Sequence, residues 1–239
     1  MTAGILSKAG YYMGDELYDG DEANPKGYFE DKEINLINEE LLAQILPARP
    51  TGIFGKLFFR SRPVLGQRWL AQVPIGTTIP VPSLIAARIK AQVAHKPFCF
   101  KDPRFCYTLP AWRPLINDAV FICVFRHPGE TVTSILKECR RADYLHSLKI
   151  DFSDALRVWK LMYQHILQVH YKPEERWLFV HYNQLLEGSV LRKFEEVLGA
   201  EVDRSFADAK YKRSSWVGDI PDQIKSIYER LCELSGYSD

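Results

Sequence analysis

The sequence predicts an α/β domain built around a parallel β-sheet, and two observations support this. Apolar runs of strand length end abruptly in turn signals at three places: Pro97–Phe100, Ala119–Phe125 and Trp177–Val180. Helical patterns follow these runs or lie between them, at about residues 131–141, 152–170 and 188–198. Short buried strands that alternate with helices are typical of parallel sheets covered on both faces.

Length and composition indicate one ordinary globular domain over residues 1–239. The chain has 31 Lys and Arg against 30 Asp and Glu, a net charge of +1, and is 46% hydrophobic. Near-neutrality excludes a globally basic nucleic-acid binder, so we expect no nucleic-acid partner, but a local basic pocket remains open. No apolar stretch approaches the ~18 residues of a membrane span, so the protein is not expected to be integral to a membrane.

The N-terminus has no signal-peptide pattern, and the five cysteines include no CxxC pair. Together these features predict a cytoplasmic protein with reduced thiols.

Three further helices are expected ahead of the first predicted strand. They span Thr2–Ala9, Asp31–Leu46 with Asp31 as cap, and a segment that Pro82 opens. Residues 45–81 interrupt the α/β pattern as an irregular insertion with a short helix near Gln67–Gln72, and we predict that they shape an acceptor-binding region. The side chains there fit an amphipathic or anionic acceptor, a glycan or a lipid, and fit a partner surface equally well: Phe54, Phe58, Phe59, Arg60, Arg62, Arg68 and Trp69.

A basic residue stands directly after the second predicted strand. Arg126 follows Phe125, and Pro128 suits the first position of the next helix. Ligands of parallel sheets lie beyond the carboxyl ends of the strands, and a helix N-terminus attracts anions. The Arg126 guanidinium and the Ser134 hydroxyl, two turns into the helix, are therefore candidates for binding phosphate. The alternative is an arginine paired with a carboxylate and a serine that faces solvent.

A second basic turn, Lys101–Arg104, closes the run Pro97–Phe100. Lys101 leaves the predicted strand there, and its ammonium group can stabilise negative charge on a leaving phosphate. The competing interpretation is a structural ion pair of Lys101 or Arg104 with Asp102 or another acid.

Glu30 is the candidate general base. It follows two aromatic residues, so its carboxylate is expected to be partly desolvated, as a general base near neutral pH requires. The alternative is a solvated acidic helix start capped by Asp31. No Cys, His and Asp cluster has metal-ligand spacing, so no metal is predicted, and GxSxG and Walker A motifs are absent.

Three longer stretches support a resemblance to a known family. They are GYYMGDELYDGDEANPKGYFEDKEINLINEELL at Gly10–Leu42, FKDPRFCYTLPAW at Phe100–Trp112 and VFRHPGETVTSIL at Val124–Leu136. A weaker fourth match, FVHYNQLLEG at Phe179–Gly188, has Asn183 and Gln184 where relatives often have two acids. Together these stretches resemble the sulfotransferase superfamily that depends on 3′-phosphoadenosine 5′-phosphosulfate (PAPS), and most of all its bacterial-type members.

The resemblance implies a P-loop NTPase-like three-layer α/β sandwich with a central parallel sheet. It also implies transfer of a sulfo group from PAPS to a hydroxyl or amine of a small-molecule, glycan or lipid acceptor, without a metal. By position, Arg126 and Ser134 would hold the 3′-phosphate, Lys101 would stabilise the bridging oxygen, and Glu30 would be the acceptor base.

Two more arginines are candidates for the nucleotide site. Arg104 lies in the FKDPR stretch, and Arg213 lies in a basic segment ahead of Trp216. A plain solvated basic loop is the alternative for Arg213.

One departure from the family pattern concerns the phosphosulfate loop. The resemblance places a loop of the form G-x-x-[RK]-[ST]-G-T-[ST] immediately before the first helix, where its backbone would grip the 5′-phosphosulfate. The 239 residues begin at that helix, so we expect the loop and the first strand of the sheet to be missing from them. The alternative function is therefore a catalytically impaired nucleotide- or partner-binding protein that keeps the sulfotransferase fold.

Overall fold

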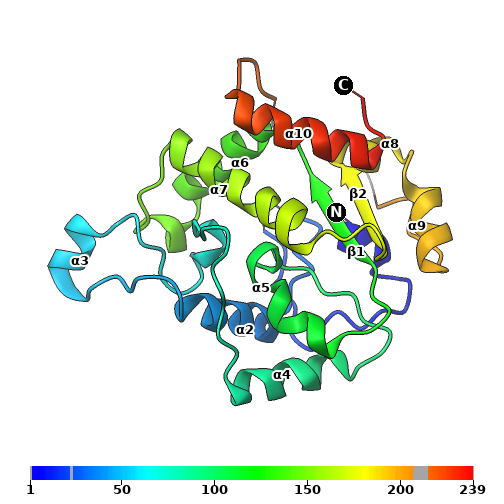
Figure 1. The fold of residues 1–239 in the computed structure, drawn as a ribbon, viewed down its shortest axis with the longest axis horizontal. Helices are drawn as coiled ribbons and strands as arrows, with labels where there is room; N and C mark the ends of the chain where they lie inside the picture. Colours follow the sequence, from blue (N-terminus) through cyan, green and yellow to red (C-terminus); the bar gives the residue numbers. More distant parts are fainter. Residues whose placement is uncertain (1, 22–23, 207–214, 239) are drawn as a thin grey trace.

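A computed structural model describes residues 2–21, 24–206 and 215–238 (Figure 1). Two parallel strands, β1 (Phe121–Phe125) and β2 (Trp177–His181), pair in register, with Phe121 opposite Trp177 and Phe125 opposite His181. Helices α6 (Pro128–Arg141) and α7 (Phe152–His165) connect them. The prediction of an α/β fold with a parallel sheet is therefore confirmed.

Helices cover both faces of this sheet, as its alternating side chains require. Cys123, Phe125 and Phe179 pack into a core with α6, α7 and α10 (Asp222–Ser235). Leu178 and Val180 point the other way and pack with α1 (Thr2–Leu6), α8 (Tyr182–Glu187) and α9 (Leu191–Leu198). The strands thus lie in the middle of three layers, with α7 and α10 on one side and α9 on the other in Figure 1.

The prediction of a strand at Pro97–Phe100 is wrong. This segment forms only an isolated parallel bridge between Phe98 and Tyr12, with the Tyr12 N–H donating to the Pro97 carbonyl at 2.8 Å. A strand needs a paired neighbour along its length, and in the described ranges β1 pairs with β2 alone. Between the 97–101 segment and β1 lies a groove of about 690 Å³, lined by the consecutive residues Ala119–Val124 and by Lys96–Lys101.

A further core lies among helices from residues 32–112. Helices α2 (Lys32–Ala43) and α4 (Ser83–Val93) pack their apolar faces together with Trp112, which ends α5 (Phe105–Trp112). The sequence patterns did not reveal α5, which carries Pro110 inside it, or α10. No helix of the described chain has the length and apolar character needed to cross a membrane.

Short elements fill the connections. Residues 45–81 are largely irregular, as expected, with helix α3 (Gly52–Phe58) and a single turn η1 (Arg68–Leu70) near the predicted position. The helix expected over 152–170 ends α-helically at His165 and continues as a π-helical turn. That π-helical turn is η4 (Ile166–His170). Two other short turns are η2 (Arg113–Leu115) and η3 (Asp143–Leu145).

Candidate active site

Strand β1 delivers Arg126 to the carboxyl edge of the sheet. The Arg126 guanidinium carbon lies 4.4 Å from the centre of the Tyr182 ring, and its Nη2 is 3.6 Å from a Glu130 carboxylate oxygen. Tyr182 follows β2 just as Arg126 follows β1, and the register of the strands brings the two residues together. With 22% of its side chain exposed, Arg126 is held by protein contacts and still reaches solvent.

Helix α6 begins immediately after Arg126. The Nδ1 atom of His127 accepts a hydrogen bond from the Gly129 N–H at 3.2 Å, so His127 is the N-cap. Pro128 stands in the first turn, as predicted. Ser134 is partly buried further along the same helix, so the structure places Arg126 and Ser134 on one strand–turn–helix unit.

Trp216 covers the start of α6. A Cβ added to Gly129 would collide with the indole ring of Trp216, so glycine is required there for this close approach. Trp216 also stacks on Phe152, with 5.2 Å between ring centres. Arg213 lies outside the described residues.

Glu30 and Lys101, 71 residues apart in sequence, form an ion pair. The Glu30 side chain is 13% exposed and also accepts a hydrogen bond from the Asn35 amide at 3.3 Å, whereas Lys101 is 42% exposed. The backbone just before Glu30 is unusual, because Phe29 has a φ of 54°, in a region that bulky residues rarely adopt. The structure therefore brings together the two residues predicted to act on the transferred group, and the same ion pair also matches the competing interpretation, in which Lys101 pairs with an acid.

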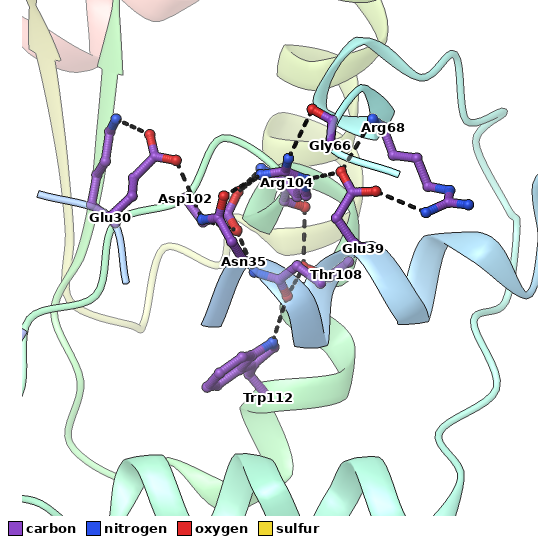
Figure 2. A network of polar contacts seen from close by, with 11 residues as sticks. Glu30, Asn35, Glu39, Gly66, Arg68, Asp102, Arg104, Thr108 and Trp112 are labelled. Atoms are coloured by element: carbon purple, nitrogen blue, oxygen red, sulfur yellow. Dashed lines mark hydrogen bonds and ion pairs between the residues drawn. The ribbon is translucent and has the colours of Figure 1, made fainter. Parts of the chain in front are cut away.

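Arg104 lies at the centre of a buried polar network, shown in Figure 2. Its Nε donates to Glu39 at 2.7 Å, and its Nη1 donates to Asp102 at 3.0 Å and to Asn35 at 3.1 Å. Only 4% of its side chain is exposed. The structural ion pair with Asp102, the competing interpretation from the sequence, is present, and the guanidinium donors face protein oxygens.

The same network fixes Asp102, the residue after Lys101. Its carboxylate accepts hydrogen bonds from the amides of Asn35 and Asn38 and from the Arg104 N–H, at 2.8 to 3.0 Å. Burial raises the pKa of the Asp102 carboxyl, and the guanidinium of Arg104 opposes that rise. This anchoring holds the backbone turn from which Lys101 projects.

Of the four predicted residues Glu30, Lys101, Arg126 and Ser134, Lys101 lines the groove along β1 and the other three are not among its lining residues. Lys101 lines it from one side and Val124, two residues before Arg126, lines it from the other. Residue patterns did not identify Tyr182 as a neighbour of Arg126 or Trp216 as a neighbour of Gly129. The available signal for Tyr182 was its place directly after a second parallel strand, which puts it at the same sheet edge.

Comparisons with known proteins identify the family of the chain. The sequence profile described as "Sulfotransferase family" matches residues 22–203. A solved structure, the sulfotransferase domain from the curacin biosynthetic pathway, is similar at 18% identity with a TM-score of 0.46, over 64% of this chain and 68% of that one. No curated protein matches the chain significantly. Because the profile spans more than half of the sequence, the chain belongs to the sulfotransferase family.

Proposed function

We propose that this protein transfers a sulfo group from PAPS to a hydroxyl or amine acceptor. The observation that carries the proposal is the contact between Glu30 and Lys101, a carboxylate paired with an ammonium whose residue lines the groove. Sulfo transfer needs a base for the acceptor and positive charge for the leaving group at neighbouring points. Local strain such as that at Phe29 accumulates at functional sites, which supports this assignment.

In the proposed reaction Glu30 accepts the proton of the acceptor hydroxyl or amine. The acceptor oxygen or nitrogen forms a bond to sulfur as the bond from sulfur to the 5′-phosphate oxygen breaks. Lys101 stabilises the charge that this oxygen gains, and adenosine 3′,5′-bisphosphate leaves. Because Lys101 and Glu30 pair with each other in the structure, the substrates must separate them.

The 3′-phosphate is assigned to the strand–turn–helix unit of Arg126 and Ser134. A guanidinium matches two phosphate oxygens, and the first N–H groups of α6 add to the positive field. Tyr182 and Glu130 orient the guanidinium from two sides. Arg213 remains a proposed phosphate contact, and we propose that Trp216, which packs against Gly129 in the first turn of α6, offers a ring surface beside the nucleotide.

Arg104 enters the proposal as a positioning residue. Its donors are directed to Glu39, Asp102 and Asn35, so it supports the turn that carries Lys101. Contact with the nucleotide would require breaking buried ion pairs.

We assign the phosphosulfate end of the donor to Lys101, which lines the groove. The groove runs along the edge of β1 that no described strand pairs with, and it is bounded across by the 97–101 segment. Thr2 and Ala3 of α1 also line the groove. The five cysteines are all free thiols, which fits the proposed cytoplasmic location.

The test is transfer from radiolabelled PAPS to a panel of hydroxyl and amine acceptors. It uses the 239-residue chain and a chain extended by the codons upstream of Met1. We expect Glu30→Gln to lower kcat by about 10²- to 10⁴-fold in the active form, as for loss of a general base. Lys101→Ala should also lower kcat, whereas Lys90→Ala, at an exposed position on α4, should leave it unchanged.

Binding of the bisphosphate without transfer, by both chains and with every acceptor, would favour the alternative of a nucleotide-binding protein without catalysis. Full activity of Glu30→Gln would remove the base from the proposal.

A further inference from the structure

Helix α3 and its flanks carry an apolar surface that the proposed reaction does not use. Four large apolar side chains of this helix are strongly exposed: Ile53 77%, Phe54 60%, Leu57 65% and Phe58 70%. They form two adjacent i,i+4 rows, and the Phe54 and Phe58 rings lie 5.1 Å apart. We name residues 51–62 the apolar finger. In Figure 1 its helix stands away from the body, at one end of the longest axis.

The finger is held in place at its base. Arg49 donates to the Arg62 carbonyl at 2.8 Å and to the Ser147 carbonyl at 3.1 Å, and Arg62 donates back to the Ala48 carbonyl at 2.9 Å. Arg60 adds a hydrogen bond to the His146 carbonyl at 3.0 Å. These contacts bind both ends of the finger to each other and to the chain after α6, so its exposed side chains are presented in a defined position.

The helix itself is also packed at its foot. Gly55 is the buried residue of α3, and a Cβ there would collide with the Pro50 carbonyl. This close contact fixes the turn of the chain that leads from Pro50 into α3. Contiguous apolar surface of this kind on a soluble protein commonly marks an interaction site.

Charge identifies the kind of partner. The 35-residue stretch 47–81 contains no Asp or Glu, and its basic residues are Arg49, Lys56, Arg60, Arg62 and Arg68, although the whole chain has a net charge of only +1. Arg68 pairs with Glu39, whereas Lys56, Arg60 and Arg62 belong to the finger and Arg49 lies just before it. Burial first, and then the positive charge of Arg60, lowers the pKa of Arg49, as expected where cations are crowded.

We propose that the apolar finger docks this protein onto an anionic lipid surface. The side chains of Ile53, Phe54, Leu57 and Phe58 would enter the boundary between headgroups and acyl chains. Lys56 and the arginines at the base of the finger would face the lipid phosphates. A projecting helix with apolar tips and basic flanks matches the layered chemistry of that boundary. A neutral membrane offers only the apolar half of this match. The proposal concerns the surface alone and does not depend on the transfer reaction.

The experiment is flotation of the 239-residue protein with vesicles of phosphatidylcholine, alone or mixed equally with phosphatidylglycerol. We expect binding to the mixed vesicles that is at least tenfold tighter than to phosphatidylcholine and that weakens when salt is raised. The double variant Phe54→Ser/Phe58→Ser should lose at least tenfold in affinity, and Lys56→Glu should lose severalfold. Leu84→Ser is the matched control, because Leu84 is 72% exposed on α4, outside the finger.

Absence of binding to the anionic vesicles would overturn the proposal, as would equal binding by the double variant and the wild type. Self-association that the double variant abolishes, without vesicle binding by the wild type, would also overturn it and assign the finger to a second copy of the chain. Circular dichroism and thermal unfolding of each variant are measured as controls for an intact fold.

Discussion

Arg104 and Arg126 stand in similar places in the sequence and differ in their surroundings. Each belongs to a short basic turn after an apolar run. The side chain of Arg104 is 4% exposed and lies between the carboxylates of Glu39 and Asp102. That of Arg126 is 22% exposed and lies over Tyr182, with its closest described carboxylate, Glu130, at 3.6 Å.

The difference comes from the element that packs against each turn. Helix α2 brings Glu39 and Asn35, 65 and 69 residues distant in sequence, against Arg104. Arg126 receives an aromatic ring and the end of a strand instead. An arginine whose donors are directed to buried carboxylates holds a fold together, because removing one partner leaves an uncompensated charge. An arginine that reaches solvent can turn its donors to a ligand.

The largest effect is expected in the buried network around Arg104. Glu39→Ala should lower the free energy of unfolding by about 3–5 kcal/mol, since Arg104 would lose a buried partner. Urea denaturation measures it. Glu33→Ala is the control on the same helix, because Glu33 pairs with Arg88 at the surface, where a pair contributes about 0–1 kcal/mol. Equal losses in the two variants would contradict the importance of the buried network.

The next effect concerns α5, the helix that follows the Arg104 turn. Neutral His170 donates through Nε2 to the Cys106 carbonyl at 2.8 Å, and burial lowers the pKa of His170 to about 4 from 6.5. The unfolded state therefore binds the proton more tightly, so stability is present above pH 6.5 and is lost as the pH falls toward 4. We expect a loss of up to about 3 kcal/mol in the free energy of unfolding between pH 7 and pH 4.

Urea denaturation across this pH range measures the effect, and the same series on His170→Gln provides the control. The variant should be less stable at pH 7 and should show a flatter dependence on pH. An unchanged slope would assign the acid sensitivity to other groups.

The smallest effect is expected for Arg126, the arginine that reaches solvent. Arg126→Ala should weaken binding of adenosine 3′,5′-bisphosphate by ~2 kcal/mol, about 30-fold, the scale of a charge-assisted hydrogen bond. Isothermal titration calorimetry measures the affinity, with Arg140→Ala at the exposed end of α6 as the control. Unchanged affinity would remove Arg126 from the site and with it the contrast to Arg104.

Local patterns were sufficient for much of the fold. Apolar runs of strand length predicted β1 and β2, and periodicity predicted α2, α4, α6 and α7. The cap at Asp31 is confirmed, since its carboxylate accepts from the Ile34 N–H at 3.0 Å. The sequence did not predict helix α5, because Pro110 interrupts its helical pattern, although core packing keeps the segment helical. Caps and periodicity involve residues close in sequence, which is why the sequence by itself determined these elements.

Contacts between distant residues were decided only by the tertiary structure. From the sequence, Arg104 could bind a ligand or form a structural ion pair. The packing of α2 against it shows the structural ion pair. The sequence predicted Glu30 and Lys101 separately, and folding joined them. It also predicted a strand at Pro97–Phe100, which forms a single bridge for want of a paired neighbour. Pairing, burial and charge neutralisation each depend on a partner from elsewhere in the chain, and only the folded chain supplies that partner.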